Sequence, residues 1–191
     1  MKKRIAIFIS GRGSNMEAII ENAESGRLKD CCEIVLVFSN KKDARGLEIA
    51  RQHGIEIACI ESRGKKREDF DRELVKLLQP YQLDYIVLAG FMRILSPVFV
   101  RTYPNRIINI HPADTAEFQG VEAYKWAFEK GMSETKITVH FVDEGVDTGP
   151  VIAQQKVDLT GANSLEEVEK RGLKVEHKFY SKVLEDVFKC K

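Results

Sequence analysis

Short, continuously apolar segments alternate with amphipathic segments along the first 110 residues of this chain. A segment that is apolar on both faces is typical of a strand in a parallel sheet, because helices cover both sides of such a sheet. A chain of 191 residues can bury a core of this kind within one domain. The pattern therefore predicts an α/β fold with a wound, mostly parallel sheet. The expected strands are 4–9, 33–38, 56–60, 84–88 and 106–110, separated by helices at 14–25, 43–53 and 66–79.

The pattern changes in the last third of the chain. Segment 137–142 alternates between apolar and polar residues, and a loop rich in Asp and Gly leads directly into segment 151–157. Antiparallel strands can be joined by a short loop, whereas parallel strands need a long crossover. We therefore expect a single Rossmann-like domain (1–191) whose sheet ends in an antiparallel hairpin. One long helix, 164–189, follows and contains Gly172.

Charge and cysteine content exclude several classes of protein. The formal net charge is +1, which predicts no broad attraction to nucleic acid or to a membrane. No apolar run approaches the roughly 20 residues that span a bilayer, and the N-terminal run ends at Gly11. Cys31, Cys32, Cys59 and Cys190 lack the spacing of a zinc site or a disulfide framework. These features predict a cytoplasmic protein with reduced thiols and no metal.

A glycine-containing turn, 11–15, lies between the first expected strand and the first expected helix. Glycine lets the backbone approach an anion, and the free amides at a helix start can bind it. Helix capping by Ser14 or Asn15 is the alternative explanation. Met16 stands where a dinucleotide-binding fingerprint would have its third glycine, and the second strand ends in Ser-Asn-Lys at 39–41, without the acidic residue that binds a ribose. The turn therefore favours a phosphate ester over a dinucleotide.

Three polar side chains are predicted to meet beyond the fifth strand. Asn109 and His111 are two residues apart, so they point to the same side, at the carboxyl edge where open α/β sheets bind ligands. Asp147 lies in the hairpin loop. Each residue alone is typical of a turn or of a packed polar group, but together an amide, an imidazole and a carboxylate suit acyl transfer to an amine. His140 fits equally well as a site residue and as a packed structural histidine.

These segments together resemble the folate-dependent formyltransferases. The matching stretches are 9–15, 88–96, 108–112, 138–147 and 149–152, so the likeness runs nearly end to end. The resemblance implies transfer of a formyl group from 10-formyltetrahydrofolate, as co-substrate, to the amine of glycinamide ribonucleotide in purine synthesis. It also implies small-molecule partners only, no metal, and a monomer or homodimer.

The resemblance assigns roles to residues by position. Those implied to be catalytic are Asn109, His111 and Asp147. Those implied to bind the phosphate and ribose of the acceptor are Gly13, Ser14, Asn15 and Glu176. Those implied to bind folate are Arg67, Met92, Arg93, Ile94, Leu95 and Asn109. Asn109 and protonated His111 would stabilise an oxyanion, and we expect the nearby charge of Asp147 to raise the pKa of His111.

One stretch departs from the family pattern. After the His-Pro pair the family usually has Ser-Leu-Leu-Pro, whereas this chain has Ala-Asp-Thr-Ala at 113–116. Phe118 and Gly120 keep the register. Because two leucines and a proline have become polar or small residues, we expect a more mobile or differently folded loop beside the active site.

Two other functions remain open at this point. One is a different folate-dependent formyl enzyme, either a formyltetrahydrofolate hydrolase, a methionyl-tRNA formyltransferase or a sugar N-formyltransferase. The other is a non-catalytic folate or nucleotide binder that lost turnover through the altered loop. The presence of Asn109, His111 and Asp147 counts against the binder.

Overall fold

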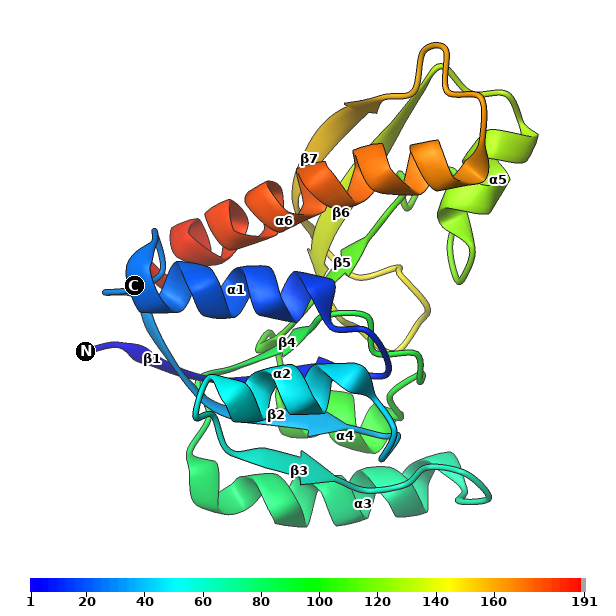
Figure 1. Ribbon diagram of the computed structural model, residues 1–191. Helices are drawn as coiled ribbons and strands as arrows, with labels where there is room; N and C mark the ends of the chain where they lie inside the picture. The colour runs from blue at the N-terminus through cyan, green and yellow to red at the C-terminus, as the bar shows by residue number, and fades with distance from the viewer. Residues whose placement is uncertain (190–191) are drawn as a thin grey trace.

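Seven strands form one sheet in the computed structural model, which describes residues 1–189. The strands are β1 (Lys3–Ile9), β2 (Cys32–Ser39), β3 (Ile57–Cys59), β4 (Tyr85–Leu88), β5 (Ile107–His111), β6 (Glu134–Phe141) and β7 (Val151–Asp158). Their order in the sheet is β3-β2-β1-β4-β5-β6-β7. Strands β1 to β5 are parallel, and β6 runs antiparallel to both of its neighbours, β5 and β7 (Figure 1). The predicted α/β architecture with a terminal hairpin is confirmed.

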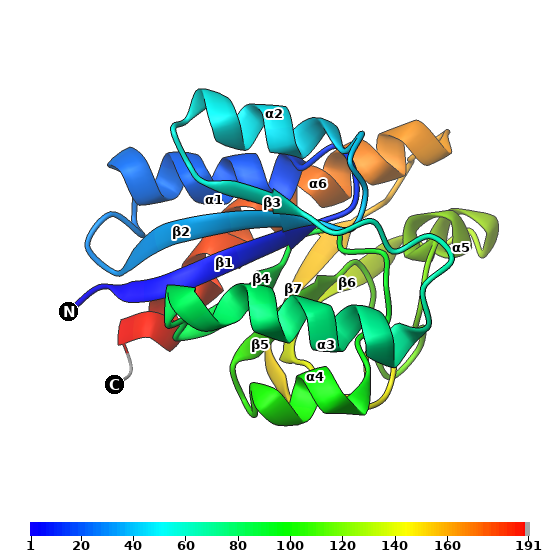
Figure 2. The same ribbon diagram turned by 90° about the horizontal axis from the view of Figure 1, so that it is seen from below.

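Strand β1 explains why these strands are apolar on both faces. Ile5, Ile7 and Ile9 belong to one core cluster, and Ala6 and Phe8 belong to the other. Full burial of a large apolar side chain of this kind contributes roughly 1.5–3 kcal/mol. The helices that cover the first face are α1 (Ser14–Ser25), α2 (Arg45–Gln52) and α6 (Leu165–Lys189), and those on the second are α3 (Arg67–Leu78) and α4 (Pro97–Thr102) (Figure 2). Both faces are therefore buried over β1.

Some short elements were not predicted from the sequence. Helices α4 and α5 (Ala123–Glu129) have six and seven residues, and η1 (Gln79–Tyr81) is a single turn. About two turns of helix are too short for a periodic apolar pattern to distinguish them from a loop. The bounds of β3 and β6 also differ from the expected 56–60 and 137–142.

Helix α6 continues through Gly172 without interruption. A β-carbon at this position would overlap the ring of Tyr124, which comes from α5. The glycine therefore makes room for a neighbouring side chain, at the cost in helix propensity that an internal glycine carries.

No helix among residues 1–189 is long and apolar enough to cross a membrane. Within the same residues, Cys31 and Cys32 are buried free thiols and Cys59 is an exposed one. Burial, more than the neighbouring Cys31, raises the pKa of Cys32 to about 12. This thiol is therefore a poor nucleophile at neutral pH. Cys190 lies outside the described residues.

The carboxyl ends of the parallel strands meet at one edge of the sheet. From β1 the chain proceeds to β2 on one side, whereas β4 lies on the other side of β1. Ligands of open α/β sheets bind outside the strand ends at such a reversal of direction. The backbone N–H of Ser10, just after β1, donates to the carbonyl of Gly90, just after β4, at 3.0 Å.

Candidate active site

A pocket of about 370 Å³ lies at this edge of the sheet. Its lining comes from the ends of β4 and β5, from the 112–120 loop with the start of α5, and from the hairpin loop 142–150. Apolar side chains are exposed at the pocket, among them Met92, Ile94, Val121 and Val146. Such an exposed apolar group beside polar residues is typical of a ligand site.

The polar floor of the pocket follows from the alternation of β5. Its isoleucines Ile108 and Ile110 point into the first core cluster, so Asn109 and His111 point to the other face. His140 on β6 is the direct cross-strand partner of Asn109. Helices α3 and α4 pack on that face through the second core cluster (Figure 2), whereas residues of the 112–120 loop and of the hairpin loop line the pocket together with Asn109, His111 and His140. The same face that packs a core under α4 therefore carries the polar groups of the pocket.

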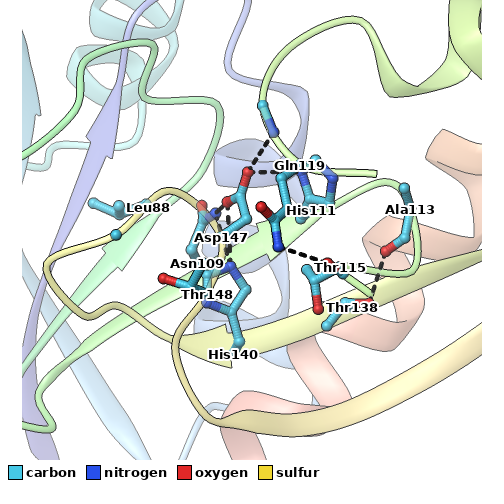
Figure 3. A network of polar contacts seen from close by, with 12 residues as sticks. Leu88, Asn109, His111, Ala113, Thr115, Gln119, Thr138, His140, Asp147 and Thr148 are labelled. Atoms are coloured by element: carbon cyan, nitrogen blue, oxygen red, sulfur yellow. Dashed lines mark hydrogen bonds and ion pairs between the residues drawn. The ribbon is translucent and has the colours of Figure 1, made fainter. Parts of the chain in front are cut away.

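Asp147 joins these groups together. Its Oδ1 accepts a hydrogen bond from Asn109 Nδ2 at 3.2 Å and lies 3.4 Å from His140 Nε2. Its Oδ2 lies 3.4 Å from His111 Nδ1 and accepts a hydrogen bond from the backbone N–H of Gly120 at 2.9 Å. Figure 3 shows Asn109, His111 and His140 converging on this carboxylate. The structure thus brings the three side chains proposed as catalytic into one cluster, and adds His140 to it.

The hairpin loop holds Asp147 in a left-handed backbone conformation, with φ of +53°. Asp tolerates this region better than most residues because its short polar side chain can form local hydrogen bonds. The loop is braced by Asp143, whose Oδ1 accepts hydrogen bonds from Gly145 N at 3.0 Å and from Thr148 Oγ1 at 2.7 Å. The unusual conformation therefore lies in a supported turn at the pocket.

His111 lies between two hydrogen-bond acceptors. Its Nε2 is 3.0 Å from the carbonyl oxygen of Phe118, and its Nδ1 faces the Asp147 carboxylate. Because a carbonyl only accepts, Nε2 carries a proton. A second proton on Nδ1 satisfies both partners, so the surroundings of the ring are shaped for imidazolium.

The pKa of His111 is nevertheless lowered overall, which corrects the expectation from the sequence. Burial is the largest influence and lowers it, while the charge of Asp147 and the Phe118 carbonyl raise it by less. His140 lowers it further. The carboxylate thus acts in the predicted direction, but the loss of solvent around the ring outweighs it.

The pKa of Asp147 lies below its ordinary value. Burial is the largest single influence and raises it, but the hydrogen bonds from His140 and Gly120, together with the charges of His111 and His140, outweigh burial. Asp147 is therefore ionised at neutral pH.

The 11–15 turn forms the start of α1, as expected. Gly13 has φ of +81°, and a β-carbon there would come within 2.9 Å of the backbone of Gly46 in α2. The Gly46 N–H donates to the Gly11 carbonyl at 3.0 Å, so the turn packs closely on a second helix. Neither Ser14 nor Asn15 caps α1 through its side chain, which weakens the capping explanation.

Glu176 lies beside this turn on the buried face of α6. One oxygen accepts a hydrogen bond from Asn15 Nδ2 at 2.5 Å, and the other accepts one from the Tyr124 hydroxyl. The Oδ1 atom of Asn15 is buried and has no hydrogen-bond partner among residues 1–189. The structure therefore places Glu176 next to the 11–15 turn. Tyr124 also belongs to this group, and no sequence motif had indicated it.

The segment 92–95 is held at both ends by buried side chains. Ser10 Oγ accepts a hydrogen bond from Met92 N at 2.7 Å and donates to Asn40 Oδ1 at 2.5 Å. Beyond the other end, Ser96 N donates to the carboxylate of Asp71 at 2.5 Å. The sequence could not identify these supports, because serine and aspartate near strand ends and helix starts are common turn and cap residues.

The residues expected at the folate site divide into two groups. All four residues of 92–95, Arg93 included, line the pocket, and Leu95 is also part of the second core cluster, whereas Arg67 does not line it. The guanidinium of Arg93 lies over the ring of Phe70 at 4.5 Å, so its charged end points away from the catalytic cluster to the α3 side. Arg67 begins α3 and is exposed.

The loop that departs from the family pattern is tied to the sheet at Asp114. Its carboxylate pairs with Lys136 Nζ at 2.6 Å and accepts a hydrogen bond from Gln154 Nε2 at 3.1 Å. The buried carbonyl of Ala113 accepts a hydrogen bond from Thr138 Oγ1 at 2.7 Å. Polar contacts to β6 and β7 therefore anchor the segment that we expected to be mobile or differently folded.

No group of three His, Cys, Asp or Glu residues within 1–189 is arranged to hold a metal ion. The pocket presents a carboxylate, two imidazoles, an amide and backbone groups in a half-buried site. Such a set can donate hydrogen bonds to a developing oxyanion and can transfer protons.

Known sequences place this fold and site in a defined class. The formyl transferase family matches residues 3–184, so the chain belongs to that family of enzymes. This confirms the resemblance seen in the sequence motifs.

Individual relatives agree with this assignment. The phosphoribosylglycinamide formyltransferase of Escherichia coli (strain K12) is 43% identical over 94% of this chain and 84% of its own length. The crystal structure of phosphoribosylglycinamide formyltransferase from Bacillus halodurans superposes with a TM-score of 0.93 at 36% identity, covering 98% of this chain and 96% of that one. The trifunctional purine biosynthetic protein adenosine-3 of Drosophila pseudoobscura pseudoobscura is 42% identical, and the chain spans only 14% of its length.

Proposed function

We propose that this chain transfers the formyl group of 10-formyltetrahydrofolate to the amine of glycinamide ribonucleotide. The observation that carries the proposal is the carboxylate of Asp147, which lies within 3.4 Å of both Asn109 and His111 on the floor of the pocket. The names of the relatives and the extent of their similarity support the same reaction.

The reaction requires that one carbon–nitrogen bond forms and another breaks. The amine nitrogen attacks the formyl carbon, and the carbonyl oxygen becomes an oxyanion. The intermediate collapses when the bond to N10 of the folate breaks. The amine loses one proton and N10 gains one, so no net proton is consumed. The site must therefore stabilise an oxyanion and move one proton.

Asn109 and His111 are the proposed oxyanion donors. The carboxylate of Asp147 only accepts hydrogen bonds, so the amide of Asn109 must turn its Nδ2 toward it. The second N–H of that amide faces His140 at 3.2 Å and exchanges this contact for the substrate oxygen. A donor aimed at the oxyanion contributes about 3 kcal/mol in comparable acyl-transfer sites. Because burial lowers the pKa of His111, the neutral ring prevails in the free protein at neutral pH. In this proposal the ring takes up a proton as the negative charge of the oxyanion develops beside it, because a nearby negative charge favours imidazolium.

Asp147 is the proposed proton carrier and positioning group. As an ionised carboxylate it favours charged His111, and it accepts the proton that the amine loses, directly or through one water. The hydrogen bond from Gly120 to Asp147 fixes the orientation of this carboxylate.

The two substrates occupy adjoining parts of the site in this proposal. The exposed side chains of Met92 and Ile94 offer apolar contact to the flat pteridine, and the backbone of 92–95 offers hydrogen bonds to its edge, next to Asn109. Arg93 and Leu95 belong to this folate segment, and Arg67 is assigned to the folate tail on the resemblance alone. The acceptor phosphate binds at the amides of Gly13, Ser14 and Asn15, and Glu176 accepts hydrogen bonds from the ribose.

The same proposal covers the organisation of the chain. Residues 1–191 form one formyltransferase domain that acts on small molecules in the cytoplasm, as a monomer or a homodimer. It uses 10-formyltetrahydrofolate as co-substrate and no metal.

A spectroscopic assay of the folate product separates the candidate functions. Product that forms only when glycinamide ribonucleotide is present supports formyl transfer to this acceptor. Product that forms equally fast without it indicates hydrolysis, and no product in either case indicates a folate or nucleotide binder. Either of the last two results contradicts the proposal.

A further inference from the structure

The 112–120 loop contributes no catalytic side chain, yet its backbone contacts both His111 and Asp147. The Phe118 carbonyl accepts from Nε2 of His111 at 3.0 Å, and the Gly120 N–H donates to Oδ2 of Asp147 at 2.9 Å. The Phe118 ring also lies parallel to the imidazole, within 9°, and stacks on Trp126. The conformation of this loop therefore determines where two catalytic groups point.

Asp114 organises the turn that leads to these contacts. Its side chain accepts a hydrogen bond from Ala116 N at 3.0 Å, and its carbonyl accepts hydrogen bonds from Glu117 N and Phe118 N, both at 2.9 Å. An Asp that binds the backbone two residues ahead is a common way to start a turn. Phe118 is thus placed directly by Asp114.

The same carboxylate connects the turn to the hairpin. It pairs with Lys136 of β6 and accepts a hydrogen bond from Gln154 of β7, whose amide also donates to Thr138 Oγ1 at 3.0 Å. The side chain of Asp114 is 13% exposed and that of Lys136 is 36% exposed. A partly buried ion pair is screened less by water and salt than a pair on the open surface.

We propose that Asp114 is a positioning residue: its ion pair with Lys136 holds the 112–120 loop so that the Phe118 carbonyl and the Gly120 amide orient His111 and Asp147. This inference rests on the proposed function, because it assigns to the loop a part in that reaction. It also accounts for the polar residues at 113–116, since Asp114 supplies the attachment of this segment to the sheet.

Substitution of Lys136 tests the proposal from outside the active site, since its only described ion pair within 1–189 is with Asp114. Lys136→Met removes the charge and keeps much of the apolar stem, whereas Lys136→Arg keeps the charge. Lys156→Met is the matched control. Lys156 lies directly opposite Lys136 in the hairpin and pairs with Glu134 at 2.8 Å, away from the loop.

Among the three lysine variants, we expect a loss of turnover only in Lys136→Met. We expect Lys136→Met to lower kcat about tenfold and to change the KM for 10-formyltetrahydrofolate by less than about twofold, because misplacement of catalytic groups affects the chemical step more than folate binding. Lys136→Arg and Lys156→Met should stay within about twofold of the unsubstituted protein. Asp114→Asn, which can still accept from Ala116 N, should show a smaller loss and provides a second variant if Lys136→Met does not fold.

An NMR titration of the His111 imidazole gives a readout that needs no substrate. The charged or titratable side chains that act on this ring, Asp147, His140 and Glu176, are not substituted in any of these variants. Removal of a nearby positive charge alone would raise the pKa of His111, and Lys156→Met measures that effect. Displacement of the Phe118 carbonyl removes an influence that raises the pKa, whereas solvent that enters with a displaced loop relieves the larger, opposite effect of burial. A His111 pKa in Lys136→Met that differs from the value in Lys156→Met, in either direction, therefore supports the proposal.

A His111 pKa in Lys136→Met equal to that in Lys156→Met overturns the positioning role, and so does a kcat equal to that of Lys156→Met, even if both variants are less stable to urea. If the unsubstituted protein transfers no formyl group, the proposed function fails by itself. The imidazole titration then still decides whether Lys136 and Asp114 orient His111.

Discussion

The two ends of the sheet are stabilised in different ways. Around β1 and β4, alternate side chains enter two apolar clusters, and helices cover both faces. Around β5 to β7, one face packs into the core, while the other carries Asn109, His111 and His140 under two loops. Contacts at the first end are apolar and numerous, whereas those at the second are hydrogen bonds and ion pairs between single atoms.

This difference indicates how the protein separates stability from chemistry. Apolar burial is proportional to area and does not depend on direction, so it tolerates small shifts. Hydrogen bonds and proton transfer require defined distances and angles. The parallel end therefore serves as a rigid base, and substitutions at the two ends should affect different measurements.

The largest effect is expected at the hairpin end. Asp147→Asn keeps the size of the side chain but removes its charge and its ability to take a proton, so we expect kcat to fall about 10³-fold, or about 4 kcal/mol in activation free energy. The free energy of unfolding should fall by less than about 2 kcal/mol. Steady-state kinetics measure kcat, and urea titration measures the free energy of unfolding. A kcat within threefold of the unsubstituted protein would refute the role of Asp147.

The reverse pattern is expected at the parallel end. Ile7 is fully buried in β1, and Ile7→Ala should lower the free energy of unfolding by about 3 kcal/mol through lost burial and a residual cavity. At a temperature where the variant remains folded, its kcat should change by less than about threefold. A large loss of kcat in the folded variant would show that the two ends are not separate in the way described here.

A smaller effect is expected where α5 meets α6. Gly172→Ala should lower the free energy of unfolding by ~1–3 kcal/mol, because the added methyl group overlaps the ring of Tyr124. In a Tyr124→Ala background the same substitution should instead stabilise by about 0.5–1 kcal/mol, since alanine favours a helix interior over glycine. Urea titration of the double-mutant cycle measures the coupling. Equal effects in both backgrounds would contradict this packing explanation.

The smallest effect concerns acid sensitivity at the hairpin end. His111 has a folded pKa below its ordinary 6.5, so the unfolded chain binds this proton more readily and stability falls as the pH drops through about 6.5. Asp147, with a folded pKa below 3.8, adds stability above that pH that is lost only on stronger acidification. Between pH 7.5 and 5, the change of unfolding free energy with pH therefore contains a contribution from His111 but none from Asp147.

His111→Gln should make the fall in unfolding free energy over that range less steep, by at most the ~1.4 kcal/mol per pH unit that one proton allows. His53→Gln, which removes an imidazole at the end of α2, is the control. Parallel curves for His111→Gln and the unsubstituted protein would contradict the lowered pKa.

Several features of the site could be read from the sequence because they depend on local pattern. The alternation of β5 placed Asn109 and His111 on one side of the strand, and the short Asp- and Gly-rich loop predicted the hairpin that carries Asp147. The glycines of the 11–15 turn marked the start of α1. Each of these inferences needs only a few neighbouring residues and the period of a strand or helix.

Other features depend on groups that carry no sequence signal. The Phe118 carbonyl and the Gly120 amide are backbone atoms, which any residue supplies in the right conformation. The contact between Tyr124 and Gly172 joins two helices, and the direction of the His111 pKa shift depends on how completely the ring is buried. A pattern of residue types does not contain these quantities.

The sequence by itself thus determined the apolar strands, their order along the chain and the set of polar residues that follow them, because burial on a sheet imposes a repeat of two residues. The tertiary structure alone decided that Asp147 meets Asn109, 38 residues away, and Gly120, 27 residues away. It also decided that the pKa of His111 is lowered, because burial of the ring outweighs the nearby charge of Asp147. The reason is physical: hydrogen-bond geometry and desolvation depend on distances in space that are set only when the loops close over the sheet.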